Sequence, residues 1–238
     1  EESHVFQSYQ DVPEGIFMMK MAKKRFEELL KKPYFKDVKV VEALQFDRTY
    51  ENIVKQASKN KIDLIVMGSH GASGLKDMFV GSNTERVVRM SNCPVLTVKH
   101  EMQKPDNINN IIFASDFTEE NYSSFPFVKK FAEIYDATIH LLKVNTPFIF
   151  EKSTNSDKTL KEFSDHFELK NVVHKVYNHD SMEQGVINYA DDINTDIISL
   201  STHGRKGLKR IIRGSFTEDV VNHSKHPVLS IKINKDAS

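Results

Sequence analysis

The residues from Asp63 to Lys99 read DLIVMGSHGASGLKDMFVGSNTERVVRMSNCPVLTVK, and a later stretch repeats them. From Asp196 to Lys232 the chain reads DIISLSTHGRKGLKRIIRGSFTEDVVNHSKHPVLSIK. The two stretches align at a constant offset without a gap, and about half of the paired residues are identical, far more than unrelated segments of this length share. The sequence therefore predicts two homologous domains, residues 1–103 and 104–238.

Each copy alternates between strand and helix patterns, most clearly in the second. Short apolar runs predict strands at residues 111–115, 138–144, 172–177, 196–200 and 226–233. Helical spacing or capping patterns predict helices at residues 118–135, at 157–169, from Ser181 (with Gln184 completing a capping box) and at 215–223. Strands that alternate with helices indicate a parallel, doubly wound α/β sheet.

The first copy is expected to be incomplete. Residues 17–31 have a helical pattern, and Val38–Leu44 match the third strand of the second copy. No earlier residues match the first two strands, and in a doubly wound sheet the first strand is central. We therefore expect a strand–helix–strand segment of about 40 residues upstream of the printed sequence. The polar residues 99–107 form the expected linker.

Composition narrows the class of protein. Lys and Arg together number 33, as do Asp and Glu, so no net positive charge argues for a nucleic-acid or anionic membrane partner. The single cysteine, Cys93, excludes an intramolecular disulfide and fits a reducing compartment. No apolar run approaches the roughly 20 residues that span a bilayer. We expect a cytoplasmic protein.

The segment from Gly68 to Ser82 holds four of the nine glycines. It lies between a predicted strand and a predicted helix, where an open α/β sheet binds ligands and a helix N-terminus favours phosphate. The spacing is neither a Walker A loop nor G-x-G-x-x-G. Residues 82–85 and 215–218 have the spacing of capping boxes, so the glycines are equally well explained as turn formers. The residues of this segment are therefore consistent both with phosphate binding and with a purely structural turn.

The pattern G-2x-G-9x-G-S/T, followed by a helix and a CPVLTVK strand, resembles the universal stress protein family. Gly68, Gly71, Gly81 and Ser82 match this pattern at every position, and the resemblance covers nearly the whole chain as a tandem pair. It implies two Rossmann-like domains of the adenine nucleotide alpha hydrolase type, each a five-stranded parallel sheet with helices on both faces. In the ATP-binding branch this segment, with Asn83 next to it here, holds the phosphates.

The same resemblance implies which residues of the second copy bind a nucleotide. The residues at the ends of the first two strands are expected at adenosine, and the motif residues at the phosphates: Ala114, Asp116, Val144, Gly204, Gly214, Ser215 and Phe216. The first motif glycine is replaced by Ser201, whose side chain is expected to tilt the loop or crowd a nucleotide. Five cationic residues between 205 and 213 favour phosphate, although a solvated basic helix face explains them as well.

Other residue types support weaker hypotheses. His70 and His203 lie between the motif glycines, where they either touch phosphate or bond locally. His223 and His226 have no third ligand at convincing spacing, so no metal site is predicted. Cys93 is not expected to be a nucleophile, and no catalytic constellation is found, so enzyme activity is not supported.

The sequence thus predicts a stress-response protein that binds ATP, with or without Mg²⁺. The alternatives are a nucleotide-free interaction scaffold of the same fold and, more weakly, a slow ATP hydrolase. The final strands PVLTVK and PVLSIK are short and apolar, and in this family the last strands commonly pair across a dimer. We expect the two repeats to pair in this way, or two chains to form a homodimer.

Overall fold

The computed structural model describes residues 3–44, 49–69, 81–99, 107–148, 152–202 and 216–233. The chain divides into two compact units, Glu1–Thr49 and Tyr50–Ser238. Among the described residues, no helix is both long enough and apolar enough to cross a membrane.

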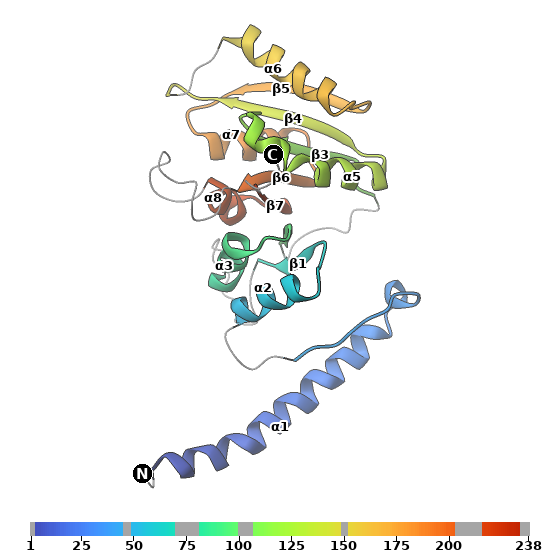
Figure 1. Cartoon of the computed structure of the whole chain (residues 1–238), viewed down its shortest axis with the longest axis vertical. Coiled ribbons are helices and arrows are strands. Elements are labelled where there is room, and N and C mark those ends of the chain that lie inside the picture. Colours follow the sequence, from blue (N-terminus) through green and yellow to red (C-terminus); the bar gives the residue numbers. More distant parts are fainter. Residues whose placement is uncertain are drawn as a thin grey trace. The chain divides into compact units, whose positions relative to one another are not determined.

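The larger unit is built on a seven-stranded sheet with the order β1-β2-β7-β6-β3-β4-β5 (Figure 1). Its strands are β1 (Ile65–Gly68), β2 (Val95–Val98), β3 (Asn110–Ala114), β4 (Thr138–Asn145), β5 (Val172–Asn178), β6 (Ile197–Thr202) and β7 (Val228–Lys232). All neighbours are parallel except β2 and β7. The predicted α/β fold is confirmed, and the second copy supplies all five of its predicted strands.

Helices cover both faces of this sheet. They are α2 (Thr49–Lys59), α3 (Ser82–Met90), α4 (Glu119–Tyr122), α5 (Phe125–Tyr135), α6 (Ser153–His166), α7 (Met182–Asp192) and α8 (Phe216–His223). The single helix predicted for residues 118–135 is wrong, because α4 ends at Tyr122 and α5 begins three residues later. Pro126 lies in the first turn of α5. It has no N–H to continue a helix from α4, but its fixed backbone suits a helix start.

The side chains of β3 divide the core into two layers. Ile112 and Ala114 pack toward α7 and α8, whereas Ile111 and Phe113 pack toward α5 and α6. In the second layer, the rings of Phe113, Phe125 and Phe163 are all fully buried. The centroid of the Phe163 ring lies 4.8 Å from that of Phe125 and 5.8 Å from that of Phe113. This alternation follows from the two-residue period of a strand buried on both faces.

The two repeats meet where β2 runs antiparallel to β7. Leu96 pairs with Leu229, its own counterpart in the repeat, and Val95 and Thr97 pair with Ser230 and Val228. The register therefore has a local two-fold axis at the leucine pair.

The helices that precede these strands, α3 and α8, repeat this symmetry. Arg89 donates two hydrogen bonds to the Glu218 carboxylate, at 2.7 and 2.9 Å. The equivalent pair, Asn222 and Glu85, is joined by a bond of 3.4 Å.

The smaller unit contains α1 (Ser3–Leu30) and a short 3₁₀ helix, η1 (Pro33–Phe35). Residues 38–44 are neither helix nor strand, so the expected third strand is not formed, and Val41 is 80% exposed. In the second copy the equivalent β5 pairs only with β4. The described residues of this unit contain no counterpart of β4, which explains why the segment has no strand partner.

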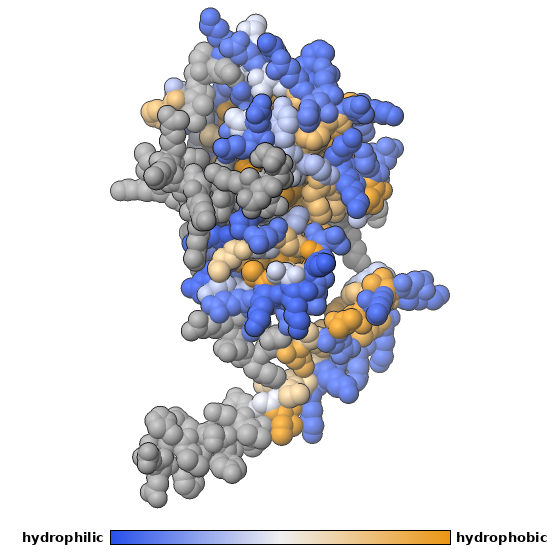
Figure 2. All heavy atoms as spheres, viewed as in Figure 1, coloured by the Kyte–Doolittle hydropathy of each residue, from blue (hydrophilic) through white to orange (hydrophobic). Residues whose placement is uncertain are grey.

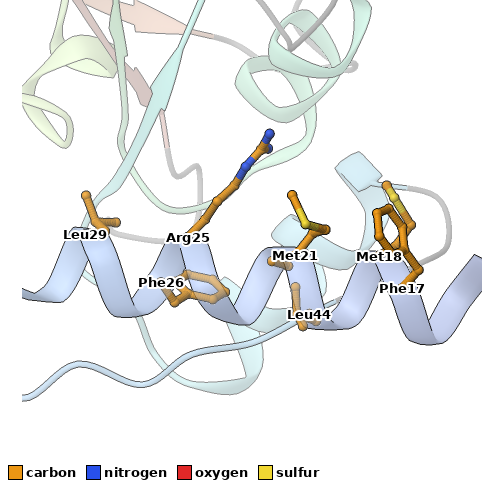
Figure 3. Close-up of a pocket in the computed structure, with 8 residues that line it drawn as sticks. Phe17, Met18, Met21, Arg25, Phe26, Leu29 and Leu44 are labelled. Carbon is orange, nitrogen blue, oxygen red and sulfur yellow. The ribbon is translucent and has the colours of Figure 1, made fainter.

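Hydrophobic side chains remain exposed on α1 for the same reason (Figure 2). An open apolar groove runs along the helix beside Leu44 (Figure 3), lined by Phe17, Met18, Met21, Ala22, Arg25, Phe26, Leu29 and Leu44. In the second copy, α6 covers its apolar face by packing on β5 and β4. The groove is thus the unpaired counterpart of a normal helix–sheet contact.

A buried histidine lies on β4, the strand next to the edge strand β5 of the large sheet. His140 of β4 is only 9% exposed, and its Nδ1 and Nε2 atoms lie 2.9 Å from the Tyr189 hydroxyl and 3.1 Å from Asn110 Oδ1. Burial lowers the pKa of His140 below its ordinary value. The folded protein therefore keeps this ring neutral under conditions in which the unfolded chain protonates it.

We expect the stability of the protein to depend on pH through His140. An unfolded histidine titrates near pH 6.5, so the stabilisation is complete above that pH and is lost as the pH falls toward the lower pKa of the folded state. The loss reaches at most about 1.4 kcal/mol per pH unit for one proton. Urea unfolding at pH 7.5 and 5.5 should show a larger decrease for the wild type than for His140→Gln. Parallel decreases would contradict the prediction.

Candidate functional site

The candidate site lies at the carboxyl ends of β3 and β6. Ala114, the last residue of β3, pairs with Leu142 of β4 on one side and with Leu200 of β6 on the other. The chain leaves β3 toward β4 and returns to β6 on the opposite side, so the strand order reverses between β3 and β6. Open α/β sheets bind ligands in the crevice formed at such a point. Ala114 itself is buried, so only the residues after it reach this edge.

Asp116 follows β3 and is held in a tight turn. Its Oδ1 atom accepts hydrogen bonds from Thr118 N at 3.0 Å, Thr118 Oγ1 at 2.9 Å and Asn121 Nδ2 at 2.5 Å. A carboxylate accepts hydrogen bonds but donates none, so all three bonds hold the same oxygen atom. The orientation of the Asp116 side chain is therefore fixed before any ligand binds.

Phe117 supports the same turn through its backbone and its ring. Its φ is 60°, a left-handed value that is unusual for a bulky residue. The ring is 97% buried, with its centroid 5.0 Å from that of Phe163 and 5.9 Å from that of Phe113. Packing thus holds a strained backbone at the point where Asp116 leaves the sheet.

Ser201 takes the place of the first motif glycine without disturbing the strand. It pairs with Ile231 in the same register in which Gly68 pairs with Val98. Its hydroxyl oxygen lies 2.8 Å from that of Ser124, the residue before α5. The register of β6 is therefore unshifted as far as Thr202, the last strand residue. The expected tilt falls on residues 203–215, which lie outside the described residues.

The other predicted residues of the second copy are distributed unevenly. Val144 lies near the end of β4 with a buried side chain, and a Cβ at Gly185 of α7 would approach its Cγ1 to 2.7 Å. Phe216 begins α8 and packs partly against the core. Gly204, Gly214, Ser215, His203 and the cationic residues at 205–213 lie outside the described residues. The structure thus brings Asp116 and the end of β6 to one edge, whereas the Val144 side chain belongs to the core.

In the first copy, the two ends of the glycine segment are held together. Gly81 N donates to Ser69 O at 2.8 Å, so the residues on either side of the segment 70–80 are hydrogen-bonded to each other. Gly71 and His70 fall within this segment and lie outside the described residues. No counterpart of Asp116 or Val144 is described in this copy.

The start of α3 differs from the predicted capping box. Gly81 is the N-cap and makes no side-chain cap bond, so Ser82 and Asn83 are exposed residues of the first turn. Thr84 instead donates through Oγ1 to Gly68 O at 3.0 Å. In the second repeat the equivalent hydrogen bond runs from Thr217 Oγ1 to Ser201 O, at 3.4 Å. Each motif helix is therefore tied to the strand that precedes it in the sequence.

The capping box predicted at Ser181, before α7, is half-formed. Gln184 N donates to the Ser181 hydroxyl, whereas the Gln184 side chain donates to Asn188.

Sequence reasoning missed several polar residues that shape the site. Asn121 and Ser124 hold the aspartate turn and the end of β6, and Thr84 and Thr217 tie the motif helices. The two threonines were detectable, since they are identical in both repeats. Asn121 and Ser124 carry no such signal, because their counterparts in the first copy are not present in the printed sequence.

The remaining candidates have local partners. His223 Nδ1 is paired with Glu183, and His226 Nε2 lies 2.9 Å from Asp191 Oδ1. No group of three or more His, Cys, Asp or Glu suited to a metal ion is found among the described residues. Cys93 is partly buried, and burial raises the pKa of its thiol, which lowers its reactivity.

Comparisons with known proteins identify the same family unit in both repeats. The model of the "Universal stress protein family" matches residues 4–99 and again residues 107–232. A universal stress protein of Methanocaldococcus jannaschii is 40% identical over 80 residues, 34% of this chain and 49% of that protein. Universal stress protein E of Photorhabdus laumondii is 23% identical over 217 residues, 81% of this chain and 68% of that protein.

Solved structures show the same fold. The crystal structure of a universal stress protein from Archaeoglobus fulgidus has a TM-score of 0.72 and 22% identity, and the match covers 92% of this chain and 78% of that one. The present chain spans about half the length of the curated relatives that it matches first. The repeat, the fold and the two family matches lead to one conclusion. The chain belongs to the universal stress protein family, and its sequence carries the family's unit twice.

Proposed function

We propose that the second repeat binds an adenine nucleotide, ATP, and that occupancy of this site regulates the protein in a stress response in the cytoplasm. The observation that carries the proposal is the Asp116 carboxylate, fixed by Thr118 and Asn121 at the switch point of the sheet. An ionised carboxylate only accepts hydrogen bonds, so it complements the amino group of adenine and repels the carbonyl oxygen of guanine. Membership in the family supports the same ligand.

The phosphate end of the proposed site comes from the motif loop. Gly204, Gly214, Ser215 and Phe216 supply its groups in the second repeat. Gly68, Gly71, Gly81, Ser82 and Asn83 are the candidates in the first. The tie from Thr217 to Ser201 O holds the helix after the loop close to β6. A helix N-terminus held in this place offers N–H donors and a positive dipole to phosphate.

The test is nucleotide binding by the purified protein. Protein prepared without added nucleotide is analysed by mass spectrometry for released ATP or ADP, and it is then titrated with ATP by calorimetry, with and without Mg²⁺. We expect binding by the wild type and weaker binding by Ser215→Ala. A protein that is empty and also fails to bind added ATP would favour the scaffold function. ATP turnover above that of the Ser215→Ala control would favour a slow hydrolase.

The proposal also assigns a role to the contact between the repeats. The domains at 1–103 and 104–238 would associate within one chain in the way that the two chains of a dimer associate. The supporting observations are the symmetric register around Leu96 and Leu229 and the matching contacts of α3 with α8. Association of two such chains into a homodimer is measured separately, by sedimentation analysis.

A double-mutant cycle tests the association of the repeats. Arg89→Met and Glu218→Gln each remove one side of the bidentate contact, and we expect a coupling energy of about 0.5–1 kcal/mol between them. The energy should decrease with added salt, because Arg89 is exposed. The measurement is urea unfolding of the four proteins. Strictly additive effects would argue that α3 and α8 do not hold this contact in solution.

A further inference from the structure

A continuous series of hydrogen bonds joins the end of β6 to the aspartate turn. Ser124 Oγ donates to Asn121 O at 2.8 Å and lies 2.8 Å from Ser201 Oγ. Because a hydroxyl has a single proton, Ser201 must be the donor to Ser124. Asn121 then donates through Nδ2 to Asp116 Oδ1. Ser201 is thus connected to Asp116 through the side chain of Ser124 and then the backbone carbonyl and side chain of Asn121, although 85 residues separate the two in the sequence.

The intermediate residues of this series are enclosed by the fold. Ser124 is 1% exposed and Asn121 is 3% exposed. Hydrogen bonds in such surroundings are stronger than in water and specify one arrangement of their partners. The series is therefore suited to transmit the position of β6 to the turn that carries Asp116.

Serine at position 201 is what makes this connection available. A glycine, which the motif has at this position and which the first repeat keeps as Gly68, offers no hydroxyl to α5. The strand register at Ser201 equals that at Gly68, so the side chain is accommodated without a backbone shift. Its hydroxyl is directed to Ser124, on the face of the sheet occupied by α5, whereas the motif helix α8 packs on the opposite face.

We infer that Ser201 is a positioning residue for the nucleotide site of the second repeat. Its hydroxyl fixes the α4–α5 segment against β6, and Asn121 of that segment holds Asp116 in the orientation that meets adenine. The inference rests on the proposed function for its ligand, but the positioning itself exists in the protein without nucleotide. It reverses the expectation that a serine at this position impairs the site.

The first test follows the turn in the nucleotide-free protein. The Thr118 amide donates to Asp116 Oδ1, so its hydrogen exchange reports how firmly the turn is held. We expect Ser201→Ala and Ser124→Ala to accelerate this exchange about three- to tenfold, the value of one neutral hydrogen bond. Ser201→Thr keeps the hydroxyl and should restore slow exchange. The Ile112 amide in β3 serves as the control. An unchanged Thr118 amide in Ser201→Ala would overturn the inference.

The second test measures binding of ATP and of inorganic triphosphate. Loss of the Ser201 hydroxyl should weaken ATP binding about three- to tenfold and leave triphosphate binding unchanged, because only adenine meets Asp116. The Ser201→Ala and Ser124→Ala effects should not add in the double variant, since both break the same series. Tighter ATP binding by Ser201→Gly would show that the side chain crowds the site and would overturn the inference. A wild type that binds no ATP would instead refute the proposed function, while Thr118 exchange still decides the positioning.

Discussion

Replacing Phe163 with alanine is expected to lower the free energy of unfolding by about 3–5 kcal/mol. The Phe163 ring is fully buried, and its centroid lies within 5.0 Å of those of Phe117, Phe125 and Tyr122. Removing it leaves a cavity that the surrounding aromatic rings cannot fill without leaving their preferred geometry. Urea unfolding followed by circular dichroism measures the change.

The matched control is Ile134→Ala on α5, because Ile134 is 67% exposed and should contribute less than about 0.5 kcal/mol. Phe163→Ala should also affect the site. Its ring packs on Phe117, whose left-handed backbone directly follows Asp116 in the turn. We therefore expect faster hydrogen exchange at Thr118 in this variant. A loss of stability no larger than that of Ile134→Ala would show that the aromatic layer is not a packed core in solution.

Asp116→Asn should weaken ATP binding by the second repeat roughly ten- to hundredfold, the value of a hydrogen bond to a charged group. The substitution is isosteric. The oxygen of the asparagine side chain can still accept hydrogen bonds from Thr118 and Asn121. Because both partners are donors, the amide is oriented with its oxygen toward them. The amide nitrogen then replaces the second carboxylate oxygen and presents donors to the amino group of adenine. Calorimetric titration with ATP measures the loss.

Asp136→Asn provides the control for this substitution. Asp136 is an exposed aspartate like Asp116, but its backbone is left-handed, it follows the last residue of α5, and it does not lie at the carboxyl ends of the strands. Asparagine is well tolerated in that conformation. Stability should therefore change little in either variant, and ATP binding should change only in Asp116→Asn. Equal ATP affinity of Asp116→Asn and the wild type would remove the carboxylate from the proposed site.

The sequence was sufficient to predict the fold of the second copy. Alternation of apolar strands with amphipathic helices is a local property, and the five strands of the second copy were found where it placed them. The break between α4 and α5 was missed because the apolar spacing continues through Pro126. The unpaired segment at Val38–Leu44 was misjudged for a different reason. A strand needs a partner, and its own apolar pattern cannot provide one.

The candidate site was predicted only in part. Asp116 could be located because it directly follows a recognisable strand, and the glycine segment because the repeat and the family pattern identify it. The contact of Ser201 could not be predicted. The motif compares serine with glycine at one position, whereas the hydroxyl of Ser201 meets Ser124, which lies 77 residues away in sequence.

The sequence by itself determined the duplication, the alternation of strands and helices and the place of Asp116, because each is encoded in residues that are close along the chain. Only the tertiary structure decided which strands pair, that Leu96 meets Leu229, and that Ser201, Ser124 and Asn121 form one series ending at Asp116. The physical reason is that hydrogen bonds and packing depend on distance in space. Short polar side chains carry no periodic signal that predicts which distant partner they meet.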